Sequence, residues 1–262
     1  MKRIKSYTRT LFNSLGFDIV RHIKTKNESQ ALKEKFPFDF NQEDIEIIKF
    51  VQPYTLTSAE RLFGLIHAVR YVVANNIPGD IVECGVWKGG SMMATAYTLK
   101  LLNDESRKLY LFDTYEGMTE PTKEDITYYG TDAAIVLKNC DRDDESSFWC
   151  RVSLDQTKKN VYSVGYNQEN INFIKGRVED TIPKYAPETI SILRLDTDWY
   201  ASTYHELEHL FPRLTPGGVL IIDDYGWWKG ARQATDEYIQ KNNIKILLNR
   251  IDCTGRIAVK LQ

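Results

Sequence analysis

Hydrophobic and polar residues alternate along this chain in blocks that switch between helical and strand spacing. Residues 1–50 are charged, with only short apolar clusters. A capping-box pattern at residues 57–60 precedes apolar residues at helical spacing, and a Pro-Gly pair follows at 78–79. We therefore expect a helix that begins near Ser58 and ends before that pair.

Further along, short apolar runs predict five buried strands, at residues 80–84, 109–112, 171–174, 190–195 and 219–222. Helical patterns lie between them, one from Ser91 and others over 203–214 and 231–240, and residues 244–248 and 256–261 suit a final antiparallel pair. Strands that alternate with helices predict an α/β fold with a doubly wound, Rossmann-like, mostly parallel sheet.

The spacing of these elements also divides the chain. We expect a helical N-terminal extension over residues 1–53 and one α/β domain over residues 54–262. The stretch 115–168 is too long for a tight connection, so it is predicted to be a lid or acceptor-binding insertion.

Composition narrows the class of protein. The formal net charge is −2, which gives no global electrostatic reason to expect nucleic acid as a partner. The sequence contains no apolar run of membrane-spanning length, and its first residues do not resemble a secretory signal. The four cysteines are scattered without the spacing of a metal site, which favours reduced thiols in a cytoplasmic protein.

The first 26 residues interleave basic and apolar side chains and contain a single acid, Asp18. One interpretation is a basic amphipathic helix that lies on an anionic membrane. We favour the alternative, in which this helix packs on the domain or on a sister subunit.

Acidic residues gather where the predicted strands end. They are Glu83, Asp113, Asp196, Asp198, Asp223 and Asp224. Carboxyl ends of parallel strands meet at one edge of the sheet, where doubly wound folds bind ligands. Carboxylates packed together repel one another unless a cation or hydrogen-bond donors compensate, so a purely structural role is disfavoured.

Two of these acids suggest a cofactor. Asp113 sits where nucleotide-binding folds place the carboxylate that accepts the ribose hydroxyls, beyond a glycine-rich turn at residues 85–90. The turn is not G-x-G-x-x-G, and taken alone it equally suits close strand–helix packing. Glu83 would oppose a pyrophosphate but suits the ammonium of S-adenosylmethionine, which argues against NAD.

Asp196, Asp223 and Asp224 supply only hard oxygen ligands from neighbouring strand ends, which suits Mg²⁺. The alternative is that the Asp223–Asp224 pair caps the turn that follows it. Asp198 remains as an uncommitted carboxylate beside this cluster, the place for a general base.

A zinc-hydrolase pattern, H-E-x-x-H, occupies residues 205–209. Helical spacing predicts that His205 and His209 project away from the apolar stripe, toward solvent and away from the cleft. Thr203 and Glu206 also match a capping box. We therefore do not expect a zinc site here.

At the strand ends the sequence resembles the macrocin O-methyltransferase family. The similar stretches are 80–96 (DIVECGVWKGGSMMATA), 111–121 (LFDTYEGMTEP), 175–182 (KGRVEDTI), 193–212 (LRLDTDWYASTYHELEHLFP) and 215–225 (TPGGVLIIDDY). Characterised members methylate sugar hydroxyls of macrolide and aminocoumarin antibiotics, use S-adenosylmethionine and Mg²⁺, and form homo-oligomers. The first fifty residues and the stretch 123–167 show no clear match. These are the regions expected to select the acceptor.

The resemblance implies a role for each matching residue. It implies metal ligation by Asp196, Asp223 and Asp224, with Asp198 as general base. It implies cofactor contacts from Glu83, Gly85, Ser91, Asp113, Gly176, Val178 and Glu179, while residues 54–58 resemble a stretch that closes over the cofactor. The acceptor would be a hydroxyl of a sugar, a glycosylated natural product or a surface glycan.

Three other interpretations stay open from the sequence. A catechol-type methyltransferase shares the metal arrangement and acts on aromatic diols. A non-catalytic scaffold could retain the fold and bind the cofactor without turnover. A nicotinamide oxidoreductase has the same fold class, although Glu83 beside a non-matching glycine turn speaks against it.

Overall fold

A computed structural model describes residues 36–142, 144 and 147–261. The predicted N-terminal amphipathic helix lies outside these residues. A compact unit spans Phe40–Gln262. Helix α3 (Gln42–Val51) belongs to this unit and packs on α5, because Ile47, Ile48 and Val51 are buried, so the compact unit begins before the expected boundary at residue 54.

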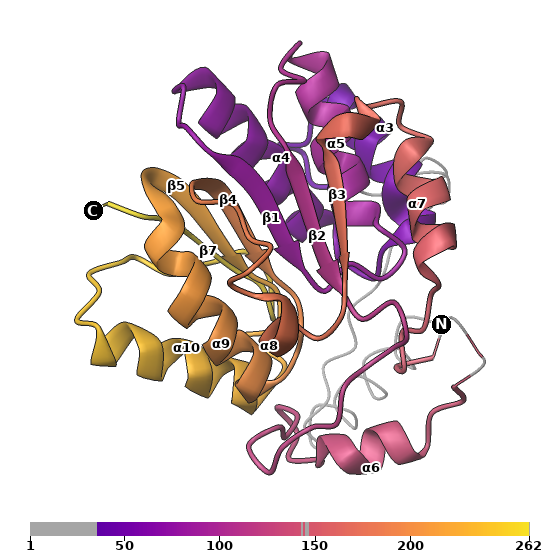
Figure 1. Cartoon of the computed structure of the whole chain (residues 1–262), viewed down its shortest axis with the longest axis vertical. Helices are drawn as coiled ribbons and strands as arrows, with labels where there is room; N and C mark the ends of the chain where they lie inside the picture. Colours follow the sequence, from indigo (N-terminus) through magenta and orange to yellow (C-terminus); the bar gives the residue numbers. More distant parts are fainter. Residues whose placement is uncertain (1–35, 143, 145–146, 262) are drawn as a thin grey trace, which may run out of the picture. The chain divides into compact units, whose positions relative to one another are not determined.

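Seven strands form one sheet in the order β3-β2-β1-β4-β5-β7-β6 (Figure 1). Their bounds are β1 Asp80–Cys84, β2 Leu109–Asp113, β3 Ile171–Lys175, β4 Ile190–Leu195, β5 Leu214–Ile222, β6 Asn249–Arg250 and β7 Arg256–Val259. Strands β1 to β5 pair in parallel, and β7 pairs antiparallel with β5 and β6. The doubly wound α/β prediction is confirmed, and the strand order reverses between β1 and β4, where such sheets bind ligands.

Two predicted strands differ by five residues from those observed. β5 begins five residues earlier than predicted, and residues 244–248 form no strand, because β7 pairs instead with Asn249–Arg250. Apolar side chains at 244, 246 and 248 pack against the core without joining the sheet. Hydrophobicity alone therefore placed the edge strand five residues too early.

Helices cover both faces of the sheet (Figure 1). One face carries α3, α4 (Ala59–Ala74), α5 (Gly90–Leu101) and α7 (Leu154–Tyr162), and the other carries α8 (Val178–Thr181), α9 (Tyr200–Leu210) and α10 (Lys229–Lys241). Single 3-10 turns are η1 (Gln52–Tyr54), η2 (Gln168–Asn170) and η3 (Phe211–Arg213). Helix α4 begins as predicted, with the Ser58 side chain accepting from the Arg61 backbone N–H.

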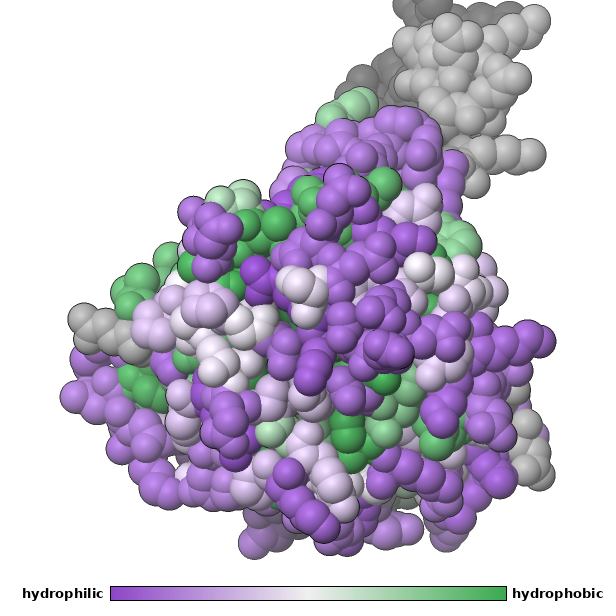
Figure 2. Space-filling view, turned by 45° about the horizontal axis from the view of Figure 1, so that its top comes forward, coloured by the Kyte–Doolittle hydropathy of each residue, from purple (hydrophilic) through white to green (hydrophobic). Residues whose placement is uncertain are grey.

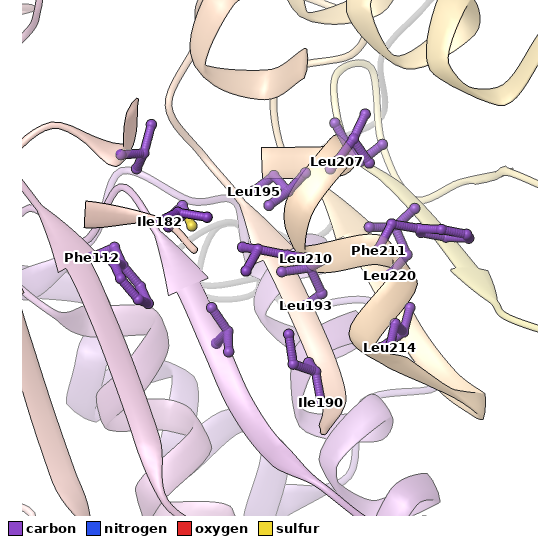
Figure 3. Close-up of a cluster of buried hydrophobic side chains, with 14 of the residues drawn as sticks. Phe112, Ile182, Ile190, Leu193, Leu195, Leu207, Leu210, Phe211, Leu214 and Leu220 are labelled. Atoms are coloured by element: carbon purple, nitrogen blue, oxygen red, sulfur yellow. The ribbon is translucent and has the colours of Figure 1, made fainter. Parts of the chain in front are cut away.

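The core on the α9 face is built from large aliphatic side chains of β4, α9 and β5 (Figure 3). All six residues of β4 are buried, as expected of a central parallel strand. Leu193 and Leu195 of β4 belong to one cluster with Leu207 and Leu210 of α9, and each such burial contributes about 1.5–3 kcal/mol. This packing holds the end of β4 in place, which positions the residues that follow it.

The long stretch between β2 and β3 contains α6 (Ala133–Lys138) and α7. Ala133 and Leu137 of α6 pack against Trp199 and Trp228, which follow β4 and β5. The Asp125 carboxylate accepts from the Tyr200 backbone N–H at 2.7 Å, at the start of α9. The insertion is therefore attached directly to the segments beyond the strand ends.

None of the helices in the described part of the chain is long and apolar enough to span a bilayer. The face shown in Figure 2 is mostly polar, and its hydrophobic residues lie in small separate groups.

Candidate active site

A cavity of about 400 Å³ opens at the carboxyl ends of β1, β2, β4 and β5, a size within the usual range for small-molecule sites. All eleven residues that the sequence singled out line it. They are Glu83, Gly85, Ser91, Asp113, Gly176, Val178, Glu179, Asp196, Asp198, Asp223 and Asp224. The structure brings the whole set together, and the role of each remains a prediction.

The turn after β1 brings the backbone close to the cavity. Gly85 has a φ of +81°, and a Cβ there would lie 1.9 Å from the backbone oxygen of Asp196. A side chain at this position would therefore push apart the ends of β1 and β4. The backbone therefore requires glycine at this position, independently of the proposed contact with a cofactor.

Asp113 at the end of β2 is held in place by three backbone donors. Its carboxylate accepts from the N–H groups of Val86 and Trp87 at 2.7 and 2.9 Å, and from that of Tyr115 at 2.6 Å. Burial raises the pKa of Asp113, and these hydrogen bonds oppose the rise. A carboxylate has about four acceptor positions, and the Thr114 hydroxyl, 3.5 Å from Oδ1, has its closer acceptor in the Gly117 oxygen at 2.6 Å, so capacity remains for a hydroxyl from the cavity.

Three buried polar atoms of the cavity wall have no hydrogen-bond partner within the described chain: Oε2 of Glu83, Oε2 of Glu179 and Nε1 of Trp87. Buried polar groups are rarely left unpaired in native proteins. Burial raises the pKa of Glu83 to about 8, against the charge of Arg194. Two acceptors and a donor that lack a hydrogen-bond partner are consistent with a polar ligand in this cavity.

Arg194, the last residue but one of β4, compensates much of the charge of the acid cluster. Its guanidinium donates to Glu83 at 2.7 Å, to Asp196 at 2.6 Å and to Asp223 at 2.5 Å, and it is 3% exposed. Burial opposes the charge, yet these three carboxylates hold the pKa of Arg194 well above its usual value. The sequence analysis missed this residue, although an arginine within the apolar strand ISILRL was a usable signal.

A second arginine reaches the same cluster from α4. Arg61 donates to Asp223 through Nη1 and to Asp252 through Nε at 2.9 Å. Arg194 also donates to the Thr57 hydroxyl at 3.0 Å. Because Thr57 lines the cavity, the two arginines link the acid cluster to the segment before α4.

Three carboxylates of the acid cluster could together bind a metal ion. One ligand oxygen each from Asp196, Asp223 and Asp224 can be chosen so that all lie within 4.8 Å of one another. An all-oxygen donor set suits Mg²⁺. Both oxygens of Asp223 already accept hydrogen bonds from Arg61 and Arg194, but each oxygen has a further lone pair. The cluster therefore fits a divalent cation that shares Asp223 with the two arginines.

Asp198 lies beside this cluster in a left-handed backbone conformation, with φ +67°. Its Oδ1 accepts from the Trp228 indole N–H at 2.6 Å, and its own backbone N–H donates to Asp224 at 3.3 Å. Burial and the nearby charge of Asp196 raise the pKa of Asp198 to about 8. Sequence analysis did not identify the contact with Trp228, which depends on how the loops after β4 and β5 meet.

Two predictions for the His-Glu-x-x-His segment on α9 differ from the structure. His205 does lie away from the acid cluster, but its ring is partly buried and contacts the Ile182 carbonyl oxygen at 3.1 Å, so it does not simply face solvent. The capping-box prediction is wrong, because α9 begins at Tyr200 and both Thr203 and Glu206 are buried within it. Glu206 points inward and accepts from the Thr197 hydroxyl at 2.9 Å.

Comparison with known proteins places the chain in a family. Residues 11–259 match the macrocin O-methyltransferase family (TylF). A Streptomyces olivaceus protein, 8-demethyl-8-(2,3-dimethoxy-alpha-L-rhamnosyl)-tetracenomycin-C 4'-O-methyltransferase, is 35% identical over 77% of this chain and 74% of its own length. Demethyldecarbamoylnovobiocin O-methyltransferase of Streptomyces niveus is 30% identical over the same shares.

Solved structures agree with the fold. The O-methyltransferase NovP superposes with a TM-score of 0.71 at 28% identity, over 80% of this chain and 83% of that one. The calicheamicin methyltransferase CalS11 has a TM-score of 0.59 at 16% identity, over 91% and 94% of the two chains. Membership of a methyltransferase family supports S-adenosylmethionine as the cofactor. The protein is an O-methyltransferase and belongs to the macrocin O-methyltransferase family.

Proposed function

We propose that this protein transfers the methyl group of S-adenosylmethionine to a hydroxyl oxygen of a sugar, carried by a small glycosylated molecule or a glycan. Asp196, Asp223 and Asp224 would hold Mg²⁺, and Asp198 would act as the general base. The observation that carries the proposal is that these four carboxylates, which we call the acid end, line the same cavity as Glu83 and Asp113, which we call the cofactor end.

The cofactor end of the cavity supports S-adenosylmethionine. The unpaired oxygen of Glu83 suits the ammonium of its amino-acid portion, and Asp113 retains capacity for a ribose hydroxyl. Gly176, which follows β3, and Val178 and Glu179, which begin α8, line the same cavity where we expect the adenine to bind. Ser91, in the first turn of α5, would contact the amino-acid portion.

The acid end supplies the chemistry that an alcohol needs. When bound, Mg²⁺ would lower the pKa of the acceptor hydroxyl and orient it. Asp198 would then take the proton, and its contact with Trp228 holds the carboxylate in one orientation. The enzyme would otherwise contribute the alignment of the hydroxyl with the sulfonium methyl and the exclusion of water.

The relatives support a sugar as the acceptor. The Streptomyces olivaceus relative acts on a rhamnosyl group by its name, and a Micromonospora griseorubida relative at 31% identity is mycinamicin III 3''-O-methyltransferase. A homo-oligomeric state and a cytoplasmic location remain predictions.

Calorimetry with S-adenosylhomocysteine, with and without Mg²⁺, tests the proposal on the wild type and on Asp113→Ala. We expect micromolar binding by the wild type and at least about a tenfold loss in the variant, because a charged hydrogen bond to a ligand contributes about 1.5–3 kcal/mol. The Tyr185→Ser variant, changed at an exposed site distant from the cavity lining, is the control. Absence of binding by the wild type under both conditions would contradict the proposal.

A further inference from the structure

Three aromatic side chains remain exposed beside the acid end of the cavity. Tyr128 is 67% exposed, Tyr129 79% and Trp227 39%. The Tyr128 and Tyr129 rings lie 5.4 Å apart, and the Tyr129 and Trp227 rings 6.0 Å apart, both edge to face. We call these three residues the aromatic ledge. Clustered exposed aromatic surface marks binding sites more often than isolated apolar residues do.

The ledge is continuous with the site. Trp227 lines the cavity, and its backbone N–H donates to the Asp224 backbone oxygen at 3.0 Å. Tyr128 in turn donates its backbone N–H to the Trp227 oxygen at 2.7 Å. The ledge therefore begins next to a predicted metal ligand and extends outward along the insertion.

The backbone under the ledge is well supported. Residues 127–131 form a tight turn in which the Thr127 N–H donates to the Thr131 oxygen at 2.8 Å, and Gly130 takes a φ of +90°. An antiparallel bridge joins Thr127 to Trp228, and Lys229 donates to the Ile126 oxygen at 2.9 Å. Because this backbone is held in one conformation, the segment that carries the two tyrosines need not be ordered when a ligand binds. The entropic cost of binding is therefore lower.

Resting on the function proposed above, we propose that the aromatic ledge is a second acceptor subsite, which stacks on a ring system attached to the sugar that is methylated. A sugar whose hydroxyl meets Asp198 and Asp224 has Trp227 beside it, so a substituent directed outward passes over Tyr129 and Tyr128. Aromatic faces stack on other ring systems and gain from the burial of apolar surface. The three side chains carry no positive charge to pair with a diphosphate, so the ledge itself suits the ring system of a glycoside.

Binding of paired glycosides tests the ledge. The enzyme, saturated with S-adenosylhomocysteine and Mg²⁺, is titrated with a set of pyranosides, each as its methyl and its 2-naphthyl glycoside, and with the matching nucleoside diphosphate sugars. The wild type should bind naphthyl glycosides at least about tenfold more tightly than methyl glycosides, since two stacked rings contribute roughly that factor. The Tyr128→Ser/Tyr129→Ser variant should lose this preference, and Tyr185→Ser should keep it.

The outcomes separate the two proposals. Loss of the naphthyl preference in the double variant, with unchanged affinity for S-adenosylhomocysteine, would support the ledge. A preference that survives the double change, no preference in the wild type, or tighter binding of the nucleotide sugars would overturn it and leave the methyltransferase function intact. Failure of the wild type to bind S-adenosylhomocysteine would overturn both.

Discussion

The carboxylates of the acid end and its surroundings fall into two groups that differ in how their charge is compensated. The arginine-bonded group consists of Glu83, Asp196 and Asp223, and the insertion-facing pair consists of Asp198 and Asp224. The first group receives the guanidinium of Arg194, and Arg61 adds a second cation at Asp223. The pair receives backbone and indole N–H donors, and in the described part of the chain no hydrogen bond joins it to a guanidinium.

This difference shows which carboxylates of the site lack a positive charge beside them. Burial raises the pKa of Asp224 well above its usual value, and the charges of Asp198 and Asp196 add to the rise. For Asp223, burial raises the pKa to only about 6, because both arginines oppose it. Asp223 can therefore keep its charge without a further ligand, whereas the insertion-facing pair favours the arrival of a cation or a proton.

The largest expected effect comes from removing the shared cation. Arg194→Met should lower the free energy of unfolding by about 3–5 kcal/mol, because it leaves buried carboxylates uncompensated. Urea denaturation measures the loss, and Arg61→Met, which changes the more exposed arginine of the cluster, should cost less. Equal stability of the wild type and Arg194→Met would remove the distinction between the two groups.

The comparison predicts opposite signs for two neighbouring substitutions. Without Mg²⁺, Asp223→Asn should destabilise the fold, because it removes the partner of two arginines, and Asp224→Asn should stabilise it by relieving repulsion. Each change should be on the order of 1–3 kcal/mol. Both variants should lose the increase in melting temperature that we expect Mg²⁺ to give the wild type. Thermal unfolding with and without Mg²⁺ measures both effects, and the same sign for both variants without metal would contradict the comparison.

A smaller effect separates two tryptophans of one buried cluster. Trp228→Phe and Trp199→Phe each remove an indole hydrogen bond, to Asp198 and to the Thr119 carbonyl oxygen respectively, and each should cost about 1–2 kcal/mol. In ¹⁵N-labelled wild type, Mg²⁺ should shift the indole N–H resonance of Trp228, and the two variants assign the resonances. If the Trp199 resonance moved as much as that of Trp228, Asp198 would not be the link between the metal and the indole.

The effect that is smallest for one pH unit concerns Glu206, whose carboxyl group accepts from Thr197 in the loop that carries Asp196 and Asp198. Burial raises its pKa well above the usual value, so the folded state holds a proton that the unfolded state releases above about pH 4.3. Stability should therefore fall as pH rises beyond that value, by up to about 1.4 kcal/mol for each pH unit. Glu206→Gln lacks this titration, so its stability relative to the wild type should grow between pH 5 and pH 8. Parallel melting-temperature curves for the two proteins would contradict the buried neutral carboxyl.

Most of the sheet could be predicted from the sequence. Strands β1 and β4 have the predicted bounds, and β2 and β3 differ by one residue, because buried parallel strands appear as short apolar runs between turn residues. The edge strand β6 could not be placed in this way, since an exposed two-residue strand has no apolar pattern. Likewise, Glu206 matched a capping box in sequence, and only the true start of α9 showed that it lies inside the helix.

The sequence by itself determined that acids follow the strands, and the parallel sheet then brought them to one edge, because strand order and direction leave little freedom there. The tertiary structure alone decided which of these acids share the guanidinium of Arg194 and which do not. It also decided that Trp228 meets Asp198 and that the insertion presents Tyr128 and Tyr129 beside Trp227. Apart from the contact of Arg194 with Asp196, these contacts join residues from 29 to 111 positions apart, and local spacing carries no information about how such side chains meet.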